Sequence, residues 1–180
     1  MRRTWRHLSW GATWLVLLSS MATGARAQQC HGVDATSAHP SRFEMRADGT
    51  AIDGRASRMW MRCALGQVWA DGDCSATFDL HDFDGAQDAA RWLNASGGFA
   101  GHRDWRVPEI DELTSLVEPA CFDPALDMAV FPHALVTGYW SASIASGYTK
   151  GAWLVHFHHG GRYVAERYGS WAVRLVRNLR

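Results

Sequence analysis

The chain has 180 residues, 47% of them hydrophobic and 12% aromatic, with 18 basic and 18 acidic side chains. This length and composition predict a folded domain with a real hydrophobic core, and no internal repeat or low-complexity tract is present. Because the basic residues are neither in excess nor concentrated, the composition argues against a nucleic-acid-binding protein, which needs a basic face.

The first 27 residues have the pattern of a cleavable signal peptide. Three basic residues at the start, Arg2, Arg3 and Arg6, are followed by an apolar run at residues 10–18 and by small residues at Ala25 and Ala27. The apolar run is shorter than the roughly 20 residues of a membrane-spanning helix, so a retained anchor is the weaker alternative. We therefore expect cleavage after Ala27, a periplasmic or secreted protein, and no membrane span after cleavage.

Cleavage at this point changes the charge of the protein. It removes four of the 18 basic side chains and leaves 14 against 18 acidic ones, with Lys150 as the single lysine. We expect a short polar arm at residues 28–41 and one domain at residues 42–180. The mildly acidic mature chain further disfavours nucleic acid as a partner.

Four cysteines in an exported chain predict two disulfides. Four cysteines allow three pairings, and Cys63 with Cys74 is favoured because the two flank a short segment that contains Gly and Asp. Cys30 and Cys121 then pair by elimination, which would attach the start of the mature chain to the domain. A metal site is the alternative, but no Cys-x-x-Cys spacing supports it.

Two or three short strands are predicted in residues 42–68, where short apolar runs are separated by turn residues. Asp48-Gly49 is the strongest hairpin signal among these turns. A first helix is predicted at residues 82–94, with Asp82 or Asp84 as its cap and Gly97-Gly98 after its end. Its apolar residues recur at helical spacing and are expected to be buried: Ala86, Ala89, Ala90, Trp92 and Leu93.

A second helix is predicted at residues 108–117, with Pro108 in or before its first turn. Three acidic residues lie near its start, where the helix dipole favours negative charge: Glu109, Asp111 and Glu112. Four strands are then expected near residues 139–144, 152–158, 162–168 and 172–177. Strands, two central helices and strands again indicate an α+β fold with short antiparallel strands around two helices.

Six residues in the second half of the chain are interpreted as structural: Asp104, Trp105, Arg106, Trp140, Arg174 and Arg177. We expect Trp105 to fill the core and Arg106 to bind a carboxylate or carbonyl groups from neighbouring loops. Sugar stacking is the alternative for Trp140, and polyanion binding is the alternative for Arg174 and Arg177.

His156 and His158 are the first candidates for a ligand site. Residues two apart on a strand share a face, so both imidazoles are expected outside while Trp153, Val155 and Phe157 point inward. Two such imidazoles can hold Zn²⁺ or Cu²⁺ with a third ligand, for which Glu166 on the next strand is a candidate. Solvated histidines are the preferred alternative, and no metal or other cofactor is predicted.

The hairpin that follows supplies the second candidates, Arg162, Arg167 and Tyr168. Aromatic rings and guanidinium groups together suit stacking on a sugar and pairing with its sulfate or carboxylate groups. They suit ordinary sheet packing equally well, and packing is preferred for Tyr163 and Trp171.

Five aspartates in residues 71–84 raise the possibility of a calcium site. The alternating loop of an EF-hand is absent, and Asp82 and Asp84 are better explained as helix caps.

Four segments form a pattern that extends across the expected domain: MWMRCALGQVW at residues 59–69, GHRDWRVPEIDELTSL at 101–116, YWSAS at 139–143 and VRLVR at 173–177. Together they resemble the Lcl C-terminal domain family, a bacterial group long described as a domain of unknown function, and the resemblance covers residues 43–177. The family is similar in fold to C-type lectins and to formylglycine-generating enzymes. The resemblance implies a C-type-lectin-like fold and recognition of surface glycans in adhesion, including sulfated polysaccharides.

No catalytic residue is predicted, because the chain lacks a Gly-x-Ser-x-Gly, a His-Glu-x-x-His and a phosphate-binding glycine loop. Formylglycine-generating enzymes hold copper with a late cysteine pair, and no cysteine follows Cys121. We expect a non-enzymatic recognition module that binds cell-surface or envelope glycans. A structural envelope protein with a protein partner is the alternative, and an enzyme of the formylglycine-generating type is the least favoured. The acidic charge and the absence of collagen-like repeats make a neutral sugar fit no worse than a sulfated one.

Overall fold

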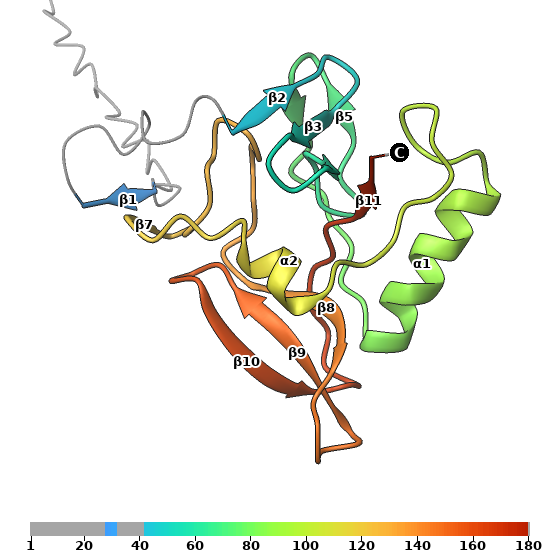
Figure 1. Cartoon of the computed structure of the whole chain (residues 1–180), viewed down its shortest axis with the longest axis vertical. Helices are drawn as coiled ribbons and strands as arrows, with labels where there is room; N and C mark the ends of the chain where they lie inside the picture. Colours follow the sequence, from blue (N-terminus) through green and yellow to red (C-terminus); the bar gives the residue numbers. More distant parts are fainter. Residues whose placement is uncertain (1–27, 32–41, 180) are drawn as a thin grey trace, which may run out of the picture.

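The computed structural model describes residues 28–31 and 42–179 (Figure 1). The expected signal peptide at residues 1–27, and residues 32–41 of the expected arm, lie outside these ranges. The described part contains a four-stranded sheet, a three-stranded sheet, two two-stranded pairs and two helices. All strand pairs are antiparallel, so the predicted α+β class with short antiparallel strands is confirmed.

The four-stranded sheet has the spatial order β11-β4-β3-β2, with strands β2 (Phe43–Met45), β3 (Thr50–Asp53), β4 (Arg58–Met61) and β11 (Val176–Asn178). β2 and β3 form the hairpin expected at Asp48-Gly49. Gly49 has a φ of 84°, and the Asp48 carboxylate accepts hydrogen bonds from the N–H and the hydroxyl of Thr50, at 3.0 and 2.6 Å. The left-handed glycine and the side-chain bonds explain why this dipeptide turns the chain.

The last strand closes this sheet beside the first part of the domain. β11 pairs with β4, with Val176 opposite Trp60. On its other side Val176 forms a bridge with Arg106, through two backbone hydrogen bonds of 2.9 Å. The end of the chain therefore connects the four-stranded sheet to the segment that leads into the second helix (Figure 1).

The first helix, α1 (Phe83–Ala95), begins where the sequence predicts. The Asp82 carboxylate accepts a hydrogen bond from the Gly85 N–H at 2.7 Å and caps the helix. Its buried face consists of Phe83, Ala86 and Ala90. Trp92 was expected on this face but is 70% exposed, because it lies about 200° around the helix from Ala90.

The second helix, α2 (Ile110–Thr114), is shorter than the predicted 108–117. It begins with a capping box, in which the Glu112 carboxylate accepts the Glu109 N–H at 2.7 Å. The helix ends early because the Val117 N–H bonds to the Thr114 carbonyl, three residues before it. Val117 then forms an antiparallel bridge with Leu126. Neither helix of the described part has the length and apolarity that a membrane crossing requires.

The three-stranded sheet has the order β10-β9-β8, with strands β8 (Gly138–Ile144), β9 (Gly151–His156) and β10 (Gly161–Glu166). Its central strand is buried on both faces. Val155 and the following Phe157 belong to one core cluster, whereas Ala152 and Leu154 belong to another that includes Phe83 of α1. The expected outer face is therefore absent at Ala152 and Leu154, which the second cluster covers, and on this face only His156 at the end of the strand is half-exposed.

Two disulfides hold the remaining short strands. β1 (Gln29–Cys30) pairs with β7 (Cys121–Phe122), and the Cys30–Cys121 bond joins them. β5 (Trp69–Ala70) pairs with β6 (Asp73–Cys74), and the Cys63–Cys74 bond attaches this hairpin close to the end of β4. Both expected pairings are present and use all four cysteines. Residues 28–31 are therefore attached to the domain.

Candidate functional site

The Asp104-Trp105-Arg106 motif lies within the scaffold. Trp105 is 2% exposed, and its indole N–H donates to the Phe99 carbonyl at 3.0 Å. The side-chain amide of Asn94 on α1 bonds both the N–H and the carbonyl of Trp105, at 3.0 and 2.7 Å. Asp104 accepts a hydrogen bond from Arg177 of β11 at 2.7 Å. The motif thus joins α1 to the last strand, which agrees with its structural interpretation.

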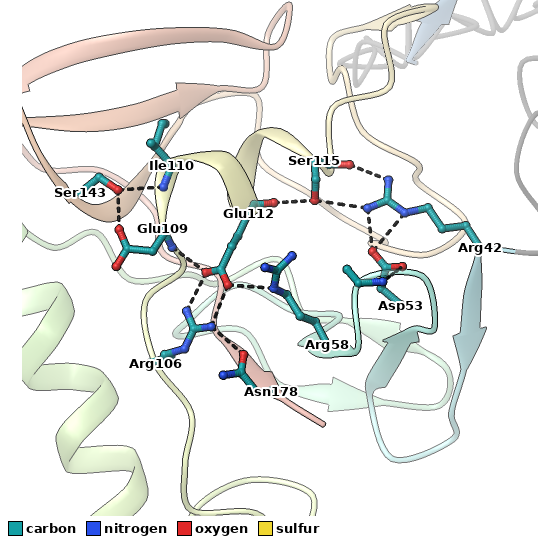
Figure 2. A network of polar contacts seen from close by, with 11 residues as sticks. Arg42, Asp53, Arg58, Arg106, Glu109, Ile110, Glu112, Ser115, Ser143 and Asn178 are labelled. Atoms are coloured by element: carbon teal, nitrogen blue, oxygen red, sulfur yellow. Dashed lines mark hydrogen bonds and ion pairs between the residues drawn. The ribbon is translucent and has the colours of Figure 1, made fainter. Parts of the chain in front are cut away.

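Arg106 leads into a buried ion network around Glu112 (Figure 2). Glu112 accepts hydrogen bonds from Arg106 at 2.6 and 2.8 Å and lies 2.8 Å from Arg58 of β4. Arg106 also donates to Asn178 of β11 at 2.8 Å. Burial alone would raise the pKa of Glu112, but hydrogen bonds from Arg106 and the Glu109 backbone, and the charges of Arg106 and Arg58, hold that pKa below its ordinary value. One carboxylate therefore joins α2 to two strands of the four-stranded sheet.

Polar contacts continue at both ends of α2 (Figure 2). Arg42 donates to Asp53 of β3 at 2.7 and 3.1 Å and to the Ser115 carbonyl at 2.5 Å. At the start of the helix, the Ser143 hydroxyl of β8 donates to Glu109 at 2.5 Å. Arg42 and Ser143 thus connect the two ends of α2 to β3 and β8, so this network holds elements of the fold together.

The three residues for which ligand binding was the alternative interpretation are buried. Arg174 is fully buried; it donates to two backbone carbonyls at and after the end of β4 and lies 4.5 Å from the ring centre of Phe131. Burial lowers the pKa of Arg174, and Tyr139 partly offsets this effect. Trp140 is 0% and Arg177 7% exposed. Trp140 and Arg174 are therefore closed to a ligand in the folded domain, whereas Arg177 binds Asp104 at the wall of a pocket of about 530 Å³.

The two histidine candidates lie next to each other, with ring centres 6.4 Å apart, and the His158 N–H donates to Nδ1 of His156 at 3.3 Å. His156 ends β9 half-buried, with its ring centre 6.1 Å from that of Trp171. His158 lies in the turn after the strand, where its Nδ1 contacts the Asp123 carboxylate. Glu166 was the candidate third metal ligand but lies at the opposite end of the β9–β10 hairpin from His156, so that expectation is wrong. Among the described residues, no three His, Cys, Asp or Glu side chains are arranged to hold a metal ion.

Replacing His156 with asparagine is expected to flatten the pH dependence of stability in the mildly acidic range. Burial, and then the charges of His159 and His158, lower the pKa of His156 below its ordinary value of 6.5. The neutral ring therefore contributes stability that is fully present above pH 6.5 and is lost as pH falls through the lowered pKa. Urea unfolding at about pH 7 and about pH 5 measures this loss. If the variant loses stability as steeply as the wild type, another group is responsible.

Arg167 and Tyr168 come together at a shallow pocket of about 310 Å³ at the end of β10. We call it the Tyr168 pocket; its lining residues are Asp82, Asp84, Thr149, Lys150, Arg167 and Tyr168. Tyr168 is 77% exposed, the highest value among the large hydrophobic side chains of the described part. Arg167 binds Asp84 of α1 and lies 4.7 Å from the ring centre of Phe83. The pocket thus places one free aromatic ring beside hydroxyl, amine, guanidinium and carboxylate groups.

The other hairpin candidates lie elsewhere. Arg162 is near the start of β10 and pairs with Asp111 of α2 at 2.8 Å. Next to it, the Tyr163 hydroxyl lies 2.9 Å from Nε2 of His159. Tyr163 also lines an apolar hollow of about 230 Å³ with His156 and Trp171. Of the predicted ligand residues, Arg167 and Tyr168 therefore share a pocket, and His156, His158 and Arg162 do not belong to it.

The aspartates at residues 71–84 do not act together in the structure. Asp82 caps α1, Asp84 binds Arg167, and Asp73 lies 2.9 Å from Nδ1 of His133. Each of these carboxylates has its own protein partner, which agrees with the helix-cap interpretation of Asp82.

A groove of about 690 Å³ was missed by the sequence reasoning. It lies between α1 and the segment after β4, and we call it the α1 groove. Trp92 and Leu93 of α1 line it, as do Leu65, Val68 and Trp69 of the facing segment. The signal that could have revealed it is the position of Trp92 outside the stripe formed by Phe83, Ala86 and Ala90, because a tryptophan on an outer helix face is an unusual surface residue.

These observations define a small α+β domain with two disulfides, an Asp-Trp-Arg motif whose tryptophan is buried, and a last strand that closes the first sheet. Residues 49–177 match the Lcl C-terminal domain, and the chain belongs to this family. The matched range begins in the turn before β3 and ends in β11. A search of curated proteins found no match.

Proposed function

We propose that the protein is an exported, non-enzymatic recognition module that binds a cell-surface or envelope glycan at the Tyr168 pocket. The observation that carries this proposal is the exposed ring of Tyr168 above a polar lining. A pyranose has an apolar face that stacks on such a ring, while its hydroxyls bond to nearby carboxylate, amine and guanidinium groups. Ordinary packing does not explain this ring, because three quarters of it is in solvent.

The charges of the Tyr168 pocket favour a neutral or weakly charged sugar. Its lining has two carboxylates, Asp82 and Asp84, and two cations, Lys150 and Arg167. Asp84 and Arg167 bind each other, and Asp82 caps α1. A densely sulfated polysaccharide needs an uncompensated basic surface, which this lining does not provide.

Export is inferred from the signal-peptide pattern, and the two disulfides support it because such bonds form in oxidising compartments. The same bonds occupy all four cysteines. No thiolate pair is then available for the copper chemistry of formylglycine-generating enzymes, which supports a non-enzymatic role. The C-type-lectin-like fold that the family resemblance implies is also compatible with recognition, although a fold alone does not determine function.

Tyr168→Ala is expected to weaken binding of the recognised sugar at least about tenfold, because it removes the stacking surface. Residues 28–180 are first screened on a glycan array, with calcium and then with chelator, and a sugar that binds is titrated by calorimetry. Tyr163→Ala is the matched control, since it removes another exposed tyrosine of the same hairpin outside the pocket.

A loss in Tyr168→Ala but not in Tyr163→Ala supports the Tyr168 pocket as the sugar site. Unchanged binding in Tyr168→Ala contradicts this site, and binding that requires calcium contradicts a cofactor-free module. If folded protein with both disulfides binds no sugar on the array, glycan binding is contradicted for the sugars tested. This result favours the alternative, a protein partner in the envelope.

A further inference from the structure

We propose that the α1 groove is a second site, which binds a short apolar and basic peptide segment of another exported protein. This inference goes beyond glycan recognition, because none of the residues that line the Tyr168 pocket also lines the α1 groove. A binding protein with one site for a sugar and one for a peptide would attach a partner to a glycan surface.

Bonds within the domain hold the walls of the groove in place. The Cys63–Cys74 disulfide fixes the segment after β4 at its start. Within this segment the Gln67 amide oxygen accepts the Ala64 N–H at 2.8 Å, and the Leu65 carbonyl accepts the Asp79 N–H at 3.0 Å. The groove is therefore formed in the absence of a ligand, which lowers the entropic cost of binding.

The surface of the groove is mostly apolar and open to solvent. Trp92 is 70% and Val68 63% exposed, although both are large hydrophobic residues. Leu65, Leu93 and Phe99 also line it. Phe78 and Leu80, two further exposed apolar residues, flank its acidic residue Asp79 in the sequence. Contiguous apolar surface of this kind marks interaction sites in proteins that are otherwise polar outside.

The charge of the groove indicates the kind of segment that fits. Its charged lining residues are the carboxylates Asp79 and Asp88, and no lysine or arginine lines it. Asp88 pairs with Arg91 on the helix surface, whereas no ion pair of Asp79 is present among the described residues. An unpaired carboxylate beside apolar walls complements a segment that carries a large apolar residue next to Lys or Arg.

The side chains of the groove suit a peptide. Its walls combine three aliphatic residues, Leu65, Val68 and Leu93, with three aromatic ones, Trp69, Trp92 and Phe99. Such walls complement aliphatic and aromatic side chains, as in grooves that bind amphipathic peptide segments. The smaller Tyr168 pocket has the polar lining expected for hydroxyl groups.

The test uses a random peptide library displayed on phage, selected on residues 28–180, followed by titration of the enriched peptides. We expect enriched peptides to combine large apolar residues with Lys or Arg. Trp92→Ala should weaken their binding at least about tenfold, and Asp79→Asn about twofold to fivefold, the effect of one exposed charge pair. The matched controls, Tyr168→Ala and Asp71→Asn, change an exposed aromatic residue and a nearby aspartate outside the groove and should leave binding unchanged.

Three results would overturn the proposal: no enriched peptide, enrichment of acidic peptides, or peptide binding that is unchanged in Trp92→Ala. A sugar whose binding is lost in Trp92→Ala but kept in Tyr168→Ala would assign the α1 groove to glycan and would also overturn it. The two sites are tested with different variants. Absence of peptide binding at the α1 groove therefore does not change the interpretation of the glycan experiment at the Tyr168 pocket.

Discussion

Trp105→Ala is expected to lower the free energy of unfolding by about 3–5 kcal/mol. Trp105 is 2% exposed and packs in the core cluster that contains the buried face of α1. Alanine would leave a large cavity there and would remove the indole N–H that donates to the Phe99 carbonyl. Urea unfolding followed by near-ultraviolet circular dichroism measures the loss.

Two further variants make this result specific to the buried ring. Trp92→Ala removes the same side chain from an exposed position and should change the free energy of unfolding by no more than about 0.5 kcal/mol. Trp105→Phe keeps a ring in the core and should lose less than Trp105→Ala. If alanine at position 105 costs no more than alanine at position 92, Trp105 does not have the packing role assigned to it.

Glu112→Gln is expected to destabilise the domain by about 2–4 kcal/mol at neutral pH. Glu112 is 8% exposed and is bound by Arg106, Arg58 and the Glu109 N–H. Glutamine keeps the shape but leaves both guanidinium groups without their shared carboxylate. The loss is smaller than for a fully enclosed pair, because Arg106 and Arg58 are partly open to water.

The same substitution should remove part of the sensitivity to acid. The pKa of Glu112 in the folded protein is held below its ordinary value of 4.5, despite burial, by its arginine and backbone partners. Its charge therefore contributes stability that is fully present above pH 4.5 and is lost as pH falls through the lowered pKa. The difference in unfolding free energy between wild type and Glu112→Gln should shrink when urea unfolding is repeated at about pH 3.

Glu44→Gln provides the surface control for this experiment. Glu44 is exposed and pairs with Arg46 at 3.4 Å, so its replacement should change stability by no more than about 0.5 kcal/mol. If the difference in unfolding free energy between wild type and Glu112→Gln stays constant across the pH range, the stability that Glu112 contributes does not come from its charge in the ion network.

Local signals in the sequence predicted the features that depend on neighbouring residues. Asp48-Gly49 turns the chain because an αL glycine and an Asp side chain satisfy the turn without help from distant parts. Asp82 likewise caps α1 because its carboxylate bonds to the N–H of Gly85, three residues later in the chain. The structural role expected for Trp105 and Arg106 is compatible with the burial of Trp105 and with the ion pair between Arg106 and Glu112.

Features that depend on distant residues could not be predicted in this way. The alternation in β9 identified Val155 and Phe157 as inward, but it could not show that a second cluster covers Leu154 on the other face. Arg106 pairs with Glu112, the third residue of α2. The position of the Glu112 carboxylate depends on the capping box at the start of this helix. The α1 groove was missed because its two walls come from separate segments whose approach depends on the whole fold.

The pairing of β11 with β4 also determines when this domain can fold. Arg174, just before β11, donates to the Met61 carbonyl 113 residues earlier in the chain, and the first sheet gains its outermost strand from residues 176–178. Contacts so far apart form slowly, because a long loop must close first. The four-stranded sheet therefore cannot be completed until residues 176–178 have been made and have folded back onto β4. Closure of this sheet is a long-range step, which the hairpins and helices in between do not need in order to form.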